Sequence, residues 1–107
     1  MEEYLMIYIS GKMSGEPDLN YTEFNRVAKA LRDRGHKVFN PAEIKLDKTG
    51  MTEWGIYEAY MTICLEAVEK CSIIYLLNNW NNSKGAKREL KRALELELKV
   101  TLQGEFI

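Results

Sequence analysis

Four short apolar runs alternate along this chain with three longer amphipathic segments, and this alternation restricts the fold more than any other feature. The apolar runs are residues 4–9, 36–39, 72–77 and 99–102. The segments between them, 20–34, 52–70 and 83–98, have apolar residues at helical spacing. Strands that alternate with helices form a parallel sheet covered by helices, joined by right-handed crossovers. The sequence therefore predicts an α/β three-layer sandwich with a parallel sheet of four to five strands.

The first amphipathic segment has recognisable end signals. Asn20 can cap its N-terminus, Glu23 follows at the spacing of a capping box, and Gly35 suits the left-handed residue that ends a helix. We expect this helix to bury one apolar face, made of Phe24, Val27, Ala28 and Leu31.

Length and composition limit the classes of function. The 107 residues suffice for one domain, residues 1–107, and the 46% hydrophobic and 29% charged content is typical of a soluble globular protein. A net charge of −1 without a long basic block argues against polymeric DNA or RNA as a partner. The sequence has no apolar run long enough to span a bilayer and no signal segment, so we expect a cytoplasmic protein without membrane contact.

Metal and redox chemistry have little support in the sequence. Cys64 and Cys71 lie seven residues apart on one predicted helix, about 10 Å from each other, which is beyond disulfide reach. We expect free thiols. The chain has one histidine and no Cys-x-x-Cys pair, so no metal site is predicted. Gly11 and Gly15 do not form a dinucleotide fingerprint and Gly85 is not part of a Walker loop, so we expect no bound cofactor and no NTPase.

Glu89 is a carboxylate on the apolar stripe of the last predicted helix, among Ala86, Leu90, Ala93 and Leu94. Burying an unpaired carboxylate costs several kcal/mol, on the order of the penalty for an isolated ion. The helix follows the strand 72–77, and ligands of open α/β folds bind at the C-terminal edge of the strands. Glu89 is therefore a candidate site residue. The alternative is that it lies at the margin of the stripe, where it reaches water or pairs with Lys12 or Arg92.

Two polar loops, 10–15 and 78–85, should meet at the same edge of the sheet. Glycines allow close backbone approach, and hydroxyl and N–H groups at a helix N-terminus bind anionic oxygens. A phosphate group would fit there, with Lys12 and Lys84 nearby. Exposed lysines beside loops are also common without any function.

Several segments together resemble a known family. They are residues 8–15 (YISGKMSG), Phe24 with Leu31, residues 35–42 (GHKVFNPA), residues 71–77 (CSIIYLL), and the pattern Trp80-x-x-Ser83-x-Gly-Ala-x-x-Glu89. Nearly the whole chain thus resembles the small proteins of phage and prophage genomes that are grouped with the nucleoside 2-deoxyribosyltransferases. This family also includes hydrolases that cleave deoxynucleoside 5'-monophosphates. The resemblance implies a flavodoxin-like or Rossmann-like fold and a nucleoside or nucleoside 5'-monophosphate as the small-molecule substrate.

The resemblance also implies roles for single residues. Glu89 matches the nucleophile that attacks the anomeric carbon, and Tyr8 matches the tyrosine that orients it. Ser83 matches the phosphate-contacting serine of the hydrolases, whereas the transferases have an aspartate there. We expect the nearby helix N-terminus to keep Glu89 ionised, and relatives suggest a homo-oligomer. The remaining expected substrate-binding residues are Ser10, Gly11, Lys12, Ser14, Gly15, Trp80 and Gly85.

Cys64 departs from the family pattern, because active relatives have an aspartate at the matching position. A thiol is a poor substitute for a carboxylate at neutral pH. Either another acid, Glu58 or Glu66, serves, or the protein binds a nucleotide without turning it over. A third interpretation is a structural or partner-binding phage protein. A base could stack on Trp54 or Trp80, although a tryptophan beside a loop is as often a packing residue.

Overall fold

The computed structural model describes residues 6–105 and has the predicted alternation of strands and helices. Its regular elements are β1 (Met6–Ser10), α1 (Tyr21–Asp33), β2 (Lys37–Phe39), α2 (Glu53–Val68), β3 (Ile73–Leu76), α3 (Lys84–Glu95) and β4 (Lys99–Leu102). Single turns of 3-10 helix precede α1, follow β2 and precede α3: η1 (Pro17–Asn20), η2 (Pro41–Glu43) and η3 (Trp80–Asn82). Residues 4 and 5 of the first predicted strand lie outside the described residues.

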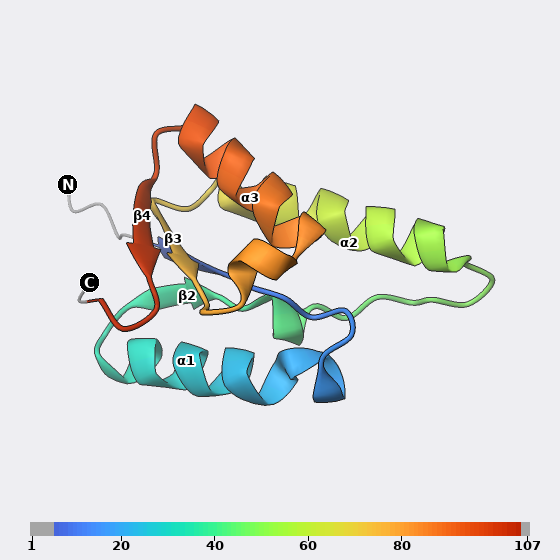
Figure 1. The fold of residues 1–107 in the computed structure, drawn as a ribbon, viewed down its shortest axis with the longest axis horizontal. Coiled ribbons are helices and arrows are strands. Elements are labelled where there is room, and N and C mark those ends of the chain that lie inside the picture. The colour runs from blue at the N-terminus through green and yellow to red at the C-terminus, as the bar shows by residue number, and fades with distance from the viewer. Residues whose placement is uncertain (1–5, 106–107) are drawn as a thin grey trace.

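All four described strands are parallel, in the order β2-β1-β3-β4 (Figure 1). Ile7 of β1 pairs with Val38 on one side and with Ile73 on the other. The chain leaves β1 toward β2 and then crosses back to β3, so the strand order reverses between β1 and β3. Loops on either side of such a reversal diverge and leave a crevice at the carboxyl edge of the sheet.

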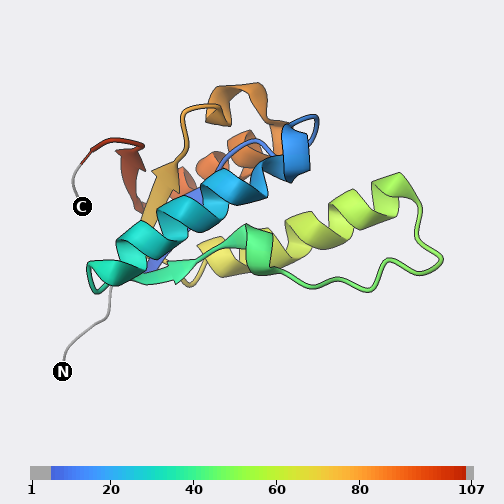
Figure 2. The same ribbon diagram turned by 90° about the horizontal axis from the view of Figure 1, so that it is seen from below.

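Helices cover both faces of the sheet, which confirms the predicted flavodoxin-like sandwich. Helix α1 lies on one face and helices α2 and α3 lie on the other (Figures 1 and 2). Side chains of a strand alternate between the two faces. Ile7 and Ile9 therefore pack in the core under α1, together with Phe24. Tyr8 points the opposite way and packs in the core under α2 and α3.

The start of α1 differs from the predicted capping box. Asn20 has a φ of +63°, and its side chain caps no helix N–H group. Its amide instead donates to the carbonyl oxygen of Lys12, at 3.1 Å. Asp18 caps the helix in place of Asn20, because the backbone N–H and the hydroxyl of Thr22 both donate to the Asp18 carboxylate. Asparagine tolerates the left-handed conformation, so Asn20 turns the chain and connects the loop after β1 to the helix.

Helices α2 and α3 each begin with a hydroxyl cap. Thr52 Oγ1 accepts from the backbone N–H of Gly55, and Ser83 Oγ accepts from that of Ala86, both at 3.0 Å. The N-terminal part of α2 extends beyond the sheet, with segment 44–52 leading to it (Figure 2). Within residues 6–105, no helix combines the length and apolar character needed to cross a membrane.

Candidate functional site

Glu89 is buried on α3, with 6% of its surface exposed. Its Oε1 atom accepts a hydrogen bond of 2.7 Å from Ser10 Oγ, at the end of β1. Arg92 pairs with Glu69 at 3.0 Å, so the alternative in which Arg92 neutralises Glu89 is wrong. The buried stripe contains Glu89 as predicted, but Leu94 is 58% exposed and does not belong to it.

Tyr8 and Cys64 complete the surroundings of this carboxylate. The Tyr8 hydroxyl is buried and has no hydrogen bond of good geometry within the described part of the chain. Burial, together with the nearby Glu89 and Cys64 groups, raises the pKa of Tyr8 well above its ordinary value. Burial and the Glu89 charge raise the pKa of the Cys64 thiol to about 12. Both groups are therefore protonated at neutral pH. Cys64 is a small buried side chain that cannot replace a carboxylate.

Burial also dominates the ionisation of Glu89. It raises the pKa of the carboxyl to about 7, although the Ser10 hydrogen bond, the neighbouring Tyr8 and Cys64 groups and the Arg88 charge oppose the shift. The expectation that the helix N-terminus keeps Glu89 ionised is wrong. The field of a helix terminus falls off within its first turn, and Glu89 lies beyond it. Near pH 7, Glu89 is thus divided between its acid and carboxylate forms.

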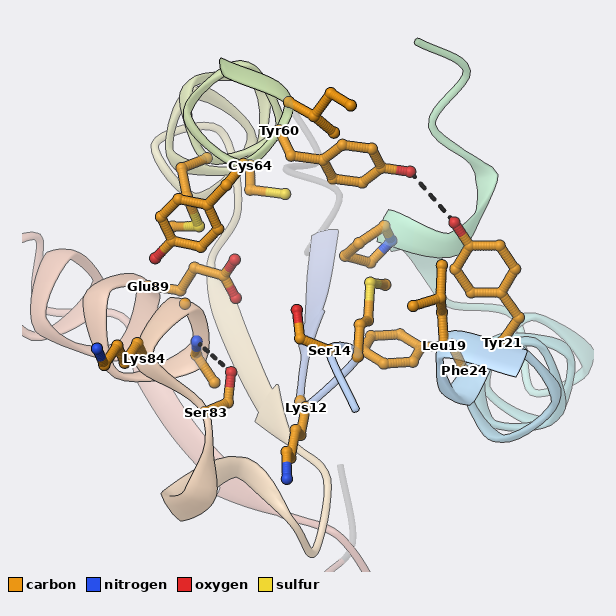
Figure 3. Close-up of a pocket in the computed structure, with 18 of the residues that line it drawn as sticks. Lys12, Ser14, Leu19, Tyr21, Phe24, Tyr60, Cys64, Ser83, Lys84 and Glu89 are labelled. Atoms are coloured by element: carbon orange, nitrogen blue, oxygen red, sulfur yellow. Dashed lines mark hydrogen bonds between the residues drawn. The ribbon is translucent and has the colours of Figure 1, made fainter. Parts of the chain in front are cut away.

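A cavity of about 450 Å³ opens above Glu89 at the carboxyl edge of β1 (Figure 3). Its volume lies within the range of small-molecule sites. The loop after β1 forms its floor, and α3, α2 and the start of α1 contribute walls. Seven of the expected site residues line it, namely Gly11, Lys12, Ser14, Cys64, Ser83, Gly85 and Glu89.

The other expected site residues lie elsewhere. Tyr8 and Ser10 are fully buried next to Glu89 and do not line the cavity. Gly15 lies in the loop but outside the lining, and Trp80 packs against the core that contains Tyr8. Trp54 is 69% exposed, outside the lining as well. Neither tryptophan is therefore placed to stack on a ligand in this cavity.

The cavity has two chemically different ends (Figure 3). We call the first the glutamate end, which consists of Glu89, Ser83 and Lys84 from α3 and the turn before it. We call the second the aromatic end, which consists of Leu19, Tyr21, Phe24 and Tyr60. Lys12 and Ser14 lie between them, on the loop after β1.

Asn79 fixes the loop that forms the cavity floor. Its Oδ1 atom accepts from the backbone N–H of Lys12, and its Nδ2 atom donates to Glu16, both at 3.0 Å. Asn20 binds the carbonyl of Lys12 from the other side. Sequence reasoning missed Asn79 because an asparagine after a strand usually signals only a turn.

The glycines of this site have packing roles in the structure. A Cβ atom on Gly11 would lie 2.8 Å from Leu77 Cδ1 and 2.9 Å from Leu77 Cβ. A Cβ atom on Gly85 would lie 3.2 Å from Met61 Sδ. Contacts this short force neighbouring atoms to move, so the absence of a side chain allows the loop and α3 to approach the core.

The candidate replacement acids do not reach the cavity. Glu58 forms an ion pair of 3.2 Å with Arg88, and Glu66 is exposed on α2. Neither lines the cavity, whereas the exposed Glu53 and Lys48, which sequence reasoning missed, do. Among residues 6–105, no three His, Cys, Asp or Glu side chains are grouped as metal ligands would be.

Comparisons with known proteins give a family and a fold. Residues 5–102 match the family described as "Domain of unknown function (DUF4406)". The structure resembles a 2-deoxyribosyltransferase from Leishmania mexicana, with a TM-score of 0.69 and 16% identity over 92% of this chain and 63% of that one. This chain thus spans less than two thirds of the Leishmania protein.

A second similar structure is a 2-deoxyribosyltransferase from the psychrotolerant bacterium Bacillus psychrosaccharolyticus. Its TM-score is 0.69, and it is 27% identical over 95% of this chain and 76% of that one. It is described as a biocatalyst for the synthesis of nucleosides. No curated protein sequence matches this chain significantly.

Proposed function

This chain belongs to the DUF4406 family, and we propose that it cleaves or exchanges the N-glycosidic bond of a nucleoside or nucleoside 5'-monophosphate, with Glu89 as the nucleophile. One observation carries the proposal. Glu89 is a buried carboxyl, hydrogen-bonded to Ser10, that lines a cavity of suitable size at the strand-order reversal. The deoxyribosyltransferase-like fold supports the same chemistry.

In the proposed reaction, the Glu89 carboxylate attacks the anomeric carbon of the sugar. A carbon–oxygen bond forms, the carbon–nitrogen bond breaks, and the bonding electrons leave with the base, which gains a proton from solvent. Water or a second base then attacks the same carbon, the carbon–oxygen bond to Glu89 breaks, and the attacking group loses a proton to solvent, as in retaining glycosidases. The Ser10 hydrogen bond orients the carboxylate, and the Tyr8 hydroxyl, which has no hydrogen-bond partner within residues 6–105, is a second orienting donor.

A phosphate group on the substrate would lie between the two loops. The Ser83 hydroxyl accepts from Ala86 and still has its own hydrogen to donate. The first N–H groups of α3, at Lys84 and Gly85, have no acceptor within the helix. The loop after β1 adds Lys12 and Ser14 to the same cavity. We therefore propose a nucleoside 5'-monophosphate over a free nucleoside.

A second candidate function is a binding module that holds a nucleotide without turnover. The observation in its favour is Cys64, whose pKa of about 12 prevents it from acting as the missing acid. Glu53 and Glu89 are the acidic residues among those that line the cavity in the described part of the chain, and Glu53 is exposed.

The finer parts of the proposal follow from the family resemblance of the sequence. They are a relation to the deoxynucleoside monophosphate hydrolases and to phage proteins, assembly as a homo-oligomer, and a cytoplasmic location. Light scattering of the purified protein measures the assembly, and a monomer at all concentrations would contradict it.

The central test is a screen of nucleosides and their 5'-monophosphates, read by release of free base. Glu89→Ala should abolish release and keep the fold, because it removes a buried charge and adds a good helix former. Unchanged turnover in this variant would refute the nucleophile. Tight binding by calorimetry without base release from the wild type would favour the binding module.

Substitutions of Ser83 test the proposed phosphate contact. Ser83→Ala should weaken nucleotide binding by roughly 1–2 kcal/mol, the range for a hydrogen bond to a charged group, and it also removes the helix cap. Ser83→Asp keeps a capping oxygen but repels phosphate, so it separates the two effects. We expect both variants to bind nucleosides nearly as the wild type does. Equal losses for nucleosides and nucleotides would refute the phosphate contact.

A further inference from the structure

Two tyrosine hydroxyls at the aromatic end form a hydrogen-bonded chain with a fixed direction (Figure 3). Tyr60 donates to the carbonyl oxygen of Ile44, at 3.3 Å, and the hydroxyl oxygens of Tyr21 and Tyr60 are 3.4 Å apart. A tyrosine hydroxyl has one hydrogen, and a carbonyl can only accept. Both hydrogen bonds can form at once only if Tyr60 donates to Ile44 and Tyr21 donates to Tyr60.

With this direction, the Tyr21 hydroxyl can accept a further hydrogen bond but cannot donate one. Its hydrogen points at Tyr60, and within residues 6–105 its oxygen has no other partner than Tyr60. Burial is the main reason why the pKa of Tyr60 is raised, so Tyr60 keeps the proton that it donates to Ile44. Tyr21 and Tyr60 are both half-buried and line the cavity. The aromatic end thus presents one oriented acceptor among apolar side chains.

The base of a bound nucleoside belongs at this end, if the proposed function holds. A nucleophile attacks the anomeric carbon from the face opposite to the departing base. Glu89 lies at the glutamate end (Figure 3), so the base must lie on the far side of the sugar. There, Leu19, Phe24 and the tyrosine rings offer apolar contact to a planar ring.

We propose that the Tyr21 hydroxyl accepts a hydrogen bond from an exocyclic amino group of the base, so that the site prefers adenine and cytosine to hypoxanthine and uracil. This inference rests on the proposed function. A keto oxygen would meet the lone pairs of Tyr21 unless that hydroxyl rotates and gives up its bond to Tyr60. The preference is therefore worth about one neutral hydrogen bond, roughly threefold to tenfold in affinity.

The test compares ligands that differ at one group of the base. Dissociation constants are measured by calorimetry for 2'-deoxyadenosine against 2'-deoxyinosine 5'-monophosphate, and for 2'-deoxycytidine against 2'-deoxyuridine 5'-monophosphate. Glu89→Gln serves as the background, to suppress turnover. We expect the amino base of each pair to bind roughly threefold to tenfold more tightly.

Two conservative variants then identify which hydroxyl causes the preference for amino bases. Tyr21→Phe removes the acceptor, so the ratio between amino and keto ligands should fall to about one. Tyr60→Phe keeps Tyr21 but frees its hydrogen, so keto ligands should gain and the ratio should fall or invert. A purely structural role for either tyrosine would weaken all four ligands alike and leave the ratios unchanged.

The outcomes separate this inference from the proposed function. Binding of all four nucleotides without preference, or a preference that persists in Tyr21→Phe, overturns the role of Tyr21 and leaves the proposed function standing. No binding of any of the four overturns this inference, and the screen of nucleosides and 5'-monophosphates with the wild type then decides the proposed function separately.

Discussion

Replacing Glu89 with glutamine should stabilise the folded protein at alkaline pH and have little effect at acidic pH. The reason is the buried carboxyl, whose pKa is raised from 4.5 to about 7. Glutamine has nearly the same shape, and its oxygen can still accept the hydrogen bond of Ser10. It does not ionise. The comparison therefore isolates the free energy of burying the charge.

Proton binding determines the sign and the size of this change in stability. The folded protein holds the Glu89 proton more tightly than the unfolded chain does, so its stability falls as the pH rises from about 4.5 to about 7. Above that range the loss is complete. Each tenfold change in a proton-binding constant is worth about 1.4 kcal/mol, so the total is about 3 kcal/mol.

Urea unfolding between pH 4 and pH 8 measures this effect as the difference between variant and wild type. We expect Glu89→Gln to match the wild type near pH 4 and to be more stable by about 3 kcal/mol at pH 8. Glu95→Gln, at an exposed position of the same helix, controls for the change in net charge. A difference that does not vary with pH, or a variant that is less stable at pH 8, would refute the burial argument.

Three further measurements address the site. Base release by the wild type should rise with pH around a midpoint near 7, because only the ionised form of Glu89 attacks; a flat profile from pH 6 to pH 8 would contradict this. Asn79→Ala should weaken nucleotide binding roughly tenfold in calorimetry, since Lys12 and Glu16 lose their partner, whereas Asn78→Ala, at an exposed position, should not. Cys64→Asp should raise base release roughly a hundredfold if the enzyme only lacks an acid, at a cost in stability beside Glu89; slower release would show that another residue already has that role.

The alternation of strands and helices could be read directly from the sequence. Hydrophobic periodicity is local, because each strand or helix shows its buried face in its own residues. The same logic placed Glu89 on the buried face of α3, where the structure has it. The free state of Cys64 and Cys71 is confirmed, but the prediction that both lie on one helix is wrong, because α2 ends at Val68 and Cys71 follows it.

The meeting of loops 10–15 and 78–85 at one edge of the sheet was predicted, but the individual contacts between distant segments could not be read in this way. Ser10 and Glu89 are 79 residues apart, and Lys12 and Asn79 are 67 apart, yet each pair is hydrogen-bonded. The strand order brings these segments together, and no local pattern encodes it. The ionisation of Glu89 was likewise misjudged, because the proximity of a helix terminus is visible in sequence whereas the extent of desolvation is not.

The aromatic end shows most clearly which features the sequence determined and which depended on the tertiary structure. Tyr60 has the helical spacing of a core residue, and Tyr21 lies at the start of a different helix, on the other face of the sheet. The sequence determined that each tyrosine belongs to an amphipathic helix. Only the packing of α1 and α2 past the end of β1 brought the two hydroxyls within 3.4 Å. Helical periodicity fixes which side of a helix is buried, but the position of one helix against another depends on the whole sheet between them.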